Sequence, residues 1–168
     1  ISACLVGSEM CIRDSILGVD PYNFSEKVIG SEFISKEVLD ITSFEVANIS
    51  ETYRLFFKEL IKKSEMKKHH NRIAMMMKFF NDMSLVVGKF YDWLKKDGRV
   101  AFVIGNKKIG DSIIPTDIIC KEIFTSHGFN FENSIFHKLK TNNSNSQVPW
   151  QERIIENEYV LFFKKVNR

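Results

Sequence analysis

Cysteine is scarce in this chain, with three among 168 residues, at positions Cys4, Cys11 and Cys120. Two of them fall in the first fifteen residues, so the rest of the chain holds no disulfide framework and we expect a protein of the reducing cytoplasm. Long apolar runs are also lacking, since no segment approaches the ~20 apolar residues that a bilayer-spanning helix needs. The sequence therefore disfavours a transmembrane role and a membrane partner.

The first fifteen residues do not read as native protein sequence. Residues 4–15 (CLVGSEMCIRDS) closely resemble the translation of a sequencing-adapter oligonucleotide, and the chain opens on Ile1 without an initiator methionine. A secretory signal is disfavoured, because charged residues interrupt the stretch where an apolar core would be required. We therefore expect residues 1–15 to be an artefact and residues 16–168 to be the carboxy-terminal part of a longer polypeptide.

Charge is nearly balanced along the chain. The 24 Lys and Arg residues against 21 Asp and Glu residues give a net charge of +3. Residues 1–15 hold one Arg and two acidic residues. The remaining chain therefore has 23 Lys and Arg residues and 19 Asp and Glu residues, which give a net charge of +4. This mildly basic balance permits a nucleic-acid partner but does not demand one, because solubility alone accounts for it.

Apolar spacing predicts two amphipathic helices in the first half of the chain. Ser50 is a suitable cap for a helix that runs to about Lys63. Between residues 73 and 94, apolar side chains recur at three- and four-residue steps, which is one face of a second helix. We expect Gly98 to end this helix in the left-handed conformation.

The spacing of apolar residues changes after Gly98. Residues 100–104 (VAFVI) are continuously apolar, which is typical of a strand buried on both faces within a helix-covered parallel sheet. Beyond a polar loop, Pro115 opens a third helix that we expect to stop at Gly128. Residues 131–139 and 158–164 are predicted strands with no helix between them, so they can pair as an antiparallel hairpin at the sheet edge. The predicted fold class is therefore α/β, the second half of an open sheet.

Several short motifs coincide with these elements. Residues 91–106 (YDWLKKDGRVAFVIGN) contain a helix, a turn and a strand, and residues 105–129 contain GN, IG, IPTD and GF in order. Residues 155–163 (IENEYVLFF) form a closing strand, while Leu17-Gly18 and residues 29–31 (IGS) lie upstream. Together these motifs resemble the carboxy-terminal half of S-adenosylmethionine-dependent DNA methyltransferases of the N4-cytosine/N6-adenine amino-methylase group. The turn departs slightly from that group, because it has Asp97 where the group more often has glycine.

The resemblance implies a Rossmann-like class I methyltransferase sheet with an antiparallel edge hairpin. It also implies transfer of a methyl group from S-adenosylmethionine to an exocyclic base amine in DNA, as in restriction-modification systems. The glycine-rich F-x-G-x-G turn that cradles the cofactor and the [D/N/S]-P-P-[Y/F/W] catalytic motif are both absent. Asp20-Pro21-Tyr22 echoes the second motif but lacks its second proline, and we interpret it as a loop. No catalytic residue is therefore assigned, the cofactor is expected to bind mainly to a missing N-terminal half, and the fragment is expected to be inactive.

The end of the apolar strand carries the candidate substrate-binding residues. Ligands of open α/β sheets bind outside the carboxyl ends of the strands. The residues at this position are Gly105, Asn106, Lys107 and Lys108. Asparagine can hydrogen-bond a base edge and lysine can hold a phosphate, while the alternative is an ordinary strand-to-loop turn. Thr116 and Asp117 are interpreted as helix-capping residues rather than ligand contacts.

A second set of candidates concerns contact with nucleic acid. Basic side chains fall in the junction between the first two helices, and a tryptophan follows the polar loop of residues 141–149. The candidates are Lys67, Lys68, Arg72 and Trp150. A solvated junction and a hydrophobic loop anchor are the alternatives. No metal site is predicted, because the adjacent histidines His69 and His70 would point apart on a helix.

Two other functions stay open. An RNA or tRNA guanine-N2 methyltransferase shares the sheet and the edge hairpin, and a decayed methylase could serve as a non-catalytic nucleic-acid-binding module. The methyltransferase interpretation requires residues 100–104 to lie centrally in the sheet, with the terminal hairpin doubling back beside them.

Overall fold

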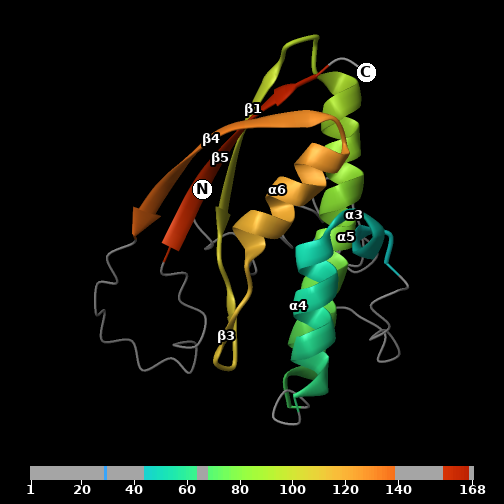
Figure 1. Ribbon diagram of the computed structural model, residues 1–168, viewed down its shortest axis with the longest axis vertical. Coiled ribbons are helices and arrows are strands. Elements are labelled where there is room, and N and C mark those ends of the chain that lie inside the picture. The colour runs from blue at the N-terminus through green and yellow to red at the C-terminus, as the bar shows by residue number, and fades with distance from the viewer. Residues whose placement is uncertain (1–28, 30–43, 64–67, 139–156, 167–168) are drawn as a thin grey trace, which may run out of the picture.

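The computed structural model describes residue 29 and residues 44–63, 68–138 and 157–166, which form a mixed α/β structure (Figure 1). The helices are α3 (Val46–Ile49), α4 (Glu51–Lys62), α5 (His70–Trp93) and α6 (Thr116–Ser126). The strands are β1 (Arg99–Gly105), β2 (Lys108–Ile109), β3 (Ser112–Ile113), β4 (Phe129–Lys138) and β5 (Asn157–Lys165). Within the described ranges, no helix is both long and apolar enough to span a bilayer.

The predicted helices are confirmed. The Ser50 side chain accepts a hydrogen bond from the Tyr53 backbone N–H at 3.0 Å, which satisfies one of the donors left open at the start of α4. The 24-residue helix α5 presents a stripe of buried residues to the core, among them Ile73, Met77 and Phe80. Helix α6 ends before Gly128, whose φ of 92° is the left-handed conformation that glycine adopts without strain. The four-residue helix α3 was not predicted.

The turn after α5 differs from the prediction. Asp97, with φ of 60°, occupies the left-handed position, so the assignment of that conformation to Gly98 was wrong. Gly98 is required for space instead, since a Cβ built on it would lie 2.9 Å from the Lys95 carbonyl oxygen. Asp97 thus stands where glycine is most favourable, and Asp is one of the few other residues that adopts this conformation.

The main sheet has the strand order β1-β5-β4. Strand β5 runs antiparallel to both neighbours, so β1 and β4 are parallel to each other and α6 connects them in the chain. The predicted antiparallel pairing of the last two strands is confirmed. The register places Val103, Val160 and Ile135 side by side in one row across the sheet.

One face of this sheet carries the hydrophobic core. Figure 1 shows the helices gathered on one side of the strands. Phe124 of α6 stacks on Phe163 of β5, with ring centroids 4.2 Å apart and planes within 6° of parallel, and it also contacts Phe102 and Phe129. These rings are the centre of the contact between the helical layer and the sheet.

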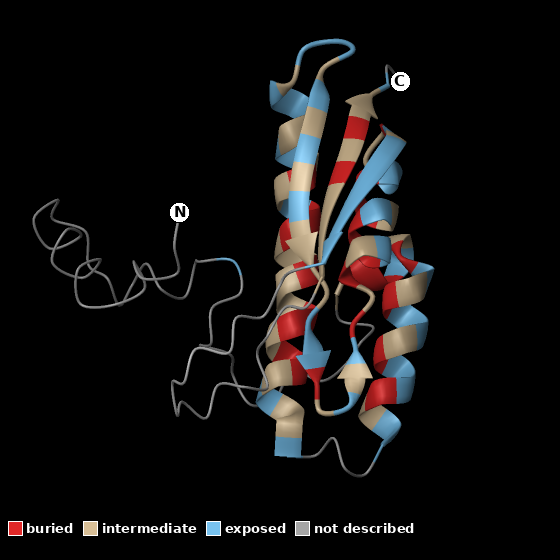
Figure 2. Cartoon of the chain, turned by 90° about the vertical axis from the view of Figure 1, so that its left-hand side faces the viewer, coloured by how far each residue is buried: buried red, intermediate tan, exposed pale blue. Residues whose placement is uncertain are grey.

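The expectation that residues 100–104 are buried on both faces and central was wrong for the described structure. Burial alternates along β1, with Ala101 exposed and Val103 58% exposed, and β1 pairs only with β5 among the described strands. Figure 2 looks onto the face of the sheet that the described helices leave uncovered, where exposed and partly buried residues alternate along β1. The physical reason is that the described helices cover only one face, which the continuous apolar run could not reveal.

A short hairpin interrupts the predicted loop between β1 and α6. Strands β2 and β3 pair antiparallel around Gly110, whose φ is 56°. Ile109 at 3% exposure and Ile114 at 0% anchor the hairpin in the hydrophobic core. This segment was expected to be irregular because its polar residues hide two anchor positions that are five residues apart.

Candidate functional site at the carboxyl end of strand β1

The end of β1 is joined to the start of α6 by one side chain. The Asn106 Oδ1 accepts a hydrogen bond from the Asp117 backbone N–H at 3.1 Å. Pro115, at the N-cap position, makes no side-chain cap, and the Thr116 hydroxyl donates instead to the Ile114 carbonyl oxygen at 3.3 Å. Asn106 therefore supplies from the strand end the cap that the prediction had given to Thr116 and Asp117.

The same amide keeps a donor for a ligand. In the described part of the chain, the Asn106 Nδ2 has no hydrogen-bond partner, while the Oδ1 is committed to α6. An asparagine amide can present two N–H donors, which suits recognition of a carbonyl or ring-nitrogen acceptor. Asn106 is half-buried and hydrogen-bonded to α6, so the protein restricts the orientation of its side chain.

The two lysines that follow point outward from this junction. Lys107 and Lys108 are both exposed, and the Lys107 carbonyl oxygen accepts from the Ile114 N–H at 2.8 Å, which closes the base of the β2–β3 hairpin. The Lys108 Nζ lies 3.9 Å from the Asp111 carboxylate. The structure thus keeps Gly105, Asn106, Lys107 and Lys108 together at the strand end, with the amide inside and the ammonium groups outside.

An aromatic residue that the sequence did not single out joins this end of the sheet. Tyr159 of β5 pairs in register with Ile104, next to Gly105. Burial, and then the Asp117 carboxylate, raise the pKa of the Tyr159 phenol, so the hydroxyl stays protonated at neutral pH. Its ring lies 5.3 Å from that of Phe136, which is 56% exposed. Only the β-sheet register brings these rings to the site, so no local pattern could have revealed them.

Two of the four predicted nucleic-acid contacts lie among the described residues. Lys68 is exposed just before α5, and Arg72 is half-buried in the first turn of that helix. Lys67 and Trp150 lie outside the described residues, as do Asp20, Pro21 and Tyr22. Among the described residues, no group of three or more His, Cys, Asp and Glu side chains comes together in a way that could hold a metal ion.

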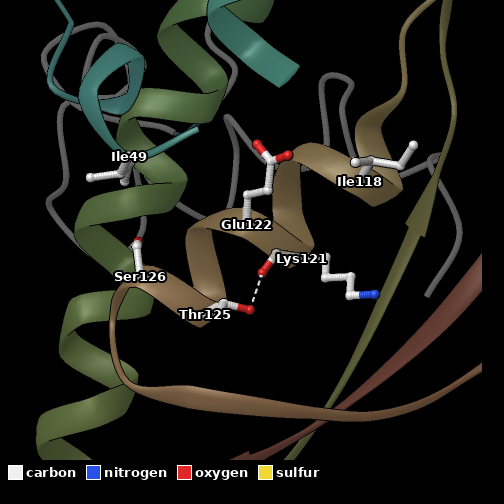
Figure 3. A pocket seen from close by; sticks show the side chains of 6 residues that line it. All are labelled: Ile49, Ile118, Lys121, Glu122, Thr125 and Ser126. Atoms are coloured by element: carbon white, nitrogen blue, oxygen red, sulfur yellow. Dashed lines mark hydrogen bonds between the residues drawn. The ribbon is translucent and has the colours of Figure 1, made fainter. Parts of the chain in front are cut away.

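A hollow of about 470 Å³ lies on α6, away from the predicted residues. Figure 3 shows its lining side chains, which are Ile49, Ile118, Lys121, Glu122, Thr125 and Ser126. Both oxygens of the Glu122 carboxylate are already hydrogen-bonded: the carboxylate accepts from the Ser50 Oγ at 2.5 Å, the Thr52 N–H at 3.1 Å and the Thr52 Oγ1 at 2.5 Å. This carboxylate ties α6 to the start of α4, so we interpret it as structural.

Two buried groups are chemically inert at neutral pH. Burial, reinforced by the Asp117 charge, raises the pKa of the Cys120 thiol to about 12, so it is not a thiolate nucleophile. Burial also raises the pKa of Tyr53, whose hydroxyl has no hydrogen-bond partner within the described residues. Neither group takes part in the candidate site.

Two substitutions of Asn106 test its role as the cap of α6. Replacement by alanine should lower the free energy of unfolding by about 1 kcal/mol, because the α6 N–H loses its acceptor. Asn106→Asp keeps an acceptor and adds a negative charge at a helix N-terminus, so its stability should stay near that of the unmodified chain. Urea denaturation of the three chains measures both changes. Equal losses in the alanine and aspartate variants would contradict the capping role.

Comparison with known proteins gives limited similarity. No protein-family model matches the chain, and no curated protein matches it in sequence. A crystal structure from Thermus thermophilus, of a protein provisionally described as a DNA modification methylase, is similar over 54% of this chain and 38% of that protein. The sequence identity is 21% and the TM-score is 0.42, and a similarity of this strength does not by itself establish a shared fold.

Proposed function

We propose that this chain is the carboxy-terminal part of an S-adenosylmethionine-dependent methyltransferase domain whose intact form methylates an exocyclic amine of cytosine or adenine in DNA. The observation that carries the proposal is the strand order β1-β5-β4, with the last strand inserted antiparallel between two parallel strands. The terminal antiparallel ribbon is what the sequence resemblance predicts for this class of sheet. The GN and IPTD motifs support the same assignment, because Asn106 and Asp117 meet at one junction.

The uncovered face of the sheet supports the proposal that a further part of the domain packs there. Val103 and Ile135 are 58% and 53% exposed, and they flank Val160 in one row of the sheet. An α/β sheet normally has helices on both faces, because each face must bury its apolar side chains. The methyltransferase interpretation requires β1 to be central, and the described strands place it at an edge. We propose that a preceding strand-and-helix unit pairs with the outer edge of β1 and covers this row, which would place β1 inside the sheet.

The chemistry of the proposed reaction is divided between this chain and the part that it lacks. The cofactor supplies an electrophilic sulfonium methyl group, and a base amine is the acceptor. The sequence holds neither the glycine-rich turn nor the proline-proline-aromatic motif, so these residues do not fit a complete cofactor or catalytic site. Within this chain, the amide N–H groups of Asn106 can donate hydrogen bonds to a carbonyl oxygen or ring nitrogen of the substrate base and so orient it. Lys107 and Lys108 can attract its phosphate groups.

The test compares the isolated chain with the product of the contiguous reading frame upstream. Transfer of labelled methyl groups from S-adenosylmethionine to duplex DNA should be absent for the isolated chain and present for the longer protein. Methyl transfer by the isolated chain would refute the assignment as a fragment. Methylation of tRNA but not DNA by the longer protein would favour the guanine-N2 alternative. A longer protein with a broken cofactor turn and no transfer would favour a non-catalytic module.

A further inference from the structure

Two groups of lysines that are far apart in the sequence lie at the same end of the molecule. Lys62 and Lys63 end α4, and Lys107 and Lys108 begin the β2–β3 hairpin. The Lys63 Nζ donates a hydrogen bond to the Ser112 Oγ at 3.3 Å, across 49 positions in the sequence. Figures 1 and 2 both show the hairpin beside the lower end of α4, and in Figure 2 it lies between α4 and α5. We call these four lysines the basic end.

Acidic residues neutralise this end only in part. Lys62 pairs with Glu59 at 2.9 Å, and Lys108 lies 3.9 Å from a fully exposed Asp111. Within the described ranges, no carboxylate lies within 4.0 Å of the ammonium groups of Lys63 and Lys107. Lys62, by hydrogen bond and charge, and then Lys58 and Lys63 by charge, lower the pKa of Glu59, so that carboxylate stays ionised amid several cations.

The lysines are carried by anchored backbone rather than by a free loop. Ile109 and Ile114 fix the hairpin in the core, and Leu60 at 2% exposure fixes the last turn of α4. Fixed cations lose less conformational freedom on binding than cations on loose segments, so they suit a regular polyanion. The regular polyanion with closely spaced charges is a nucleic-acid duplex, which has one negative charge per about 1.7 Å of its axis.

We propose that the basic end binds the phosphodiester backbone of duplex DNA and holds it beside the carboxyl end of β1. The inference rests on the proposed function for its choice of DNA, and it adds the surface that positions the duplex. Lys107 directly follows Asn106, so a backbone held by the hairpin lies next to the candidate site. Such contacts fix position and carry no sequence information, which belongs to contacts with the base edges.

The experiment measures binding of the full chain to a fluorescent mixed-sequence duplex DNA of about 20 base pairs, by anisotropy across a salt series. A variant with Lys63, Lys107 and Lys108 all changed to glutamine should bind at least about tenfold more weakly near 100 mM salt. The slope of log affinity against log salt should fall by roughly 0.9 for each phosphate that the variant no longer neutralises. The matched control changes three exposed lysines at the far end of α5 and beyond it, Lys89, Lys95 and Lys96, and should stay within about twofold of the unmodified chain.

Each outcome decides the proposal. Equal losses in both variants, tighter binding to an RNA duplex of the same length, or no binding by the unmodified chain would overturn it. A variant with arginine at positions 63, 107 and 108 should retain binding, and loss of binding by this variant would overturn the charge explanation. A changed circular dichroism spectrum of the glutamine variant would show that its weaker binding comes from altered folding, which would also overturn the charge explanation.

If the longer protein methylates DNA while the glutamine variant binds normally, only the surface is wrong. If binding depends on these lysines but the longer protein methylates no DNA, only the proposed function is wrong.

Discussion

Replacing Phe124 by alanine is expected to lower the free energy of unfolding by about 3–5 kcal/mol, the range for truncating a buried aromatic side chain. Phe124 is fully buried and contacts three other phenylalanines, so its removal opens a cavity between α6 and the sheet. Whole-domain stabilities are only about 5–15 kcal/mol, so this change would consume much of the total. Urea denaturation followed by circular dichroism measures the loss.

The control for this prediction is Phe136→Ala, which truncates the same side chain where it is 56% exposed. Phe136 contacts the Tyr159 ring but is mostly exposed, so its loss should cost less than about 1.5 kcal/mol. If the alanine variant at 124 is too unstable to purify, Phe124→Leu provides a milder cavity for the same comparison. Losses of equal size at the two positions would contradict the assignment of Phe124 to the centre of the core and of Phe136 to an exposed position.

Replacing Glu122 by alanine is expected to cost about 2–4 kcal/mol, because three donors from the start of α4 lose one shared acceptor. Glu122→Gln keeps one carbonyl oxygen, so its loss should be about half as large. Thermal and urea unfolding of both variants measure the series. The comparison is Glu132→Ala, which removes the exposed carboxylate that pairs with Arg99 and should have a smaller effect. A ranking with Glu132→Ala as the most damaging change would contradict the assigned role of Glu122.

Local patterns predicted those parts of the fold that local physics determines. The spacing of Ile73, Met77 and Phe80 on one face is visible in the sequence, and so are the cap at Ser50 and the stop at Gly128. Each of these features depends on contacts within about four residues. The sequence was therefore sufficient for α4, α5 and α6 and for the two terminal strands.

The misjudged features depend on distant partners. The exposure of Ala101 and Val103 in β1 follows from the absence of described helices over one face, and the apolar run VAFVI is compatible with either one or two covered faces. Glu122 reaches Ser50 across 72 positions, and Tyr159 meets the end of β1 only through strand register. For the candidate site, the motif located Asn106 and the lysines, but the hydrogen bond from the Asp117 N–H to the Asn106 Oδ1 joins two elements eleven positions apart and has no local signal in the sequence.

The position of β5 has a consequence for synthesis of the chain on the ribosome. Because β5 lies between β1 and β4 and follows both of them in the chain, the edges of β1 and β4 that face it stay unpaired until residues 157–165 have left the exit tunnel. The helices form from local contacts and can appear early, whereas the sheet must wait for loop closures that span about sixty residues from β1. A nascent chain halted before residue 157 would therefore expose one unpaired edge on each of these two strands, and such edges are prone to aggregation and to capture by chaperones.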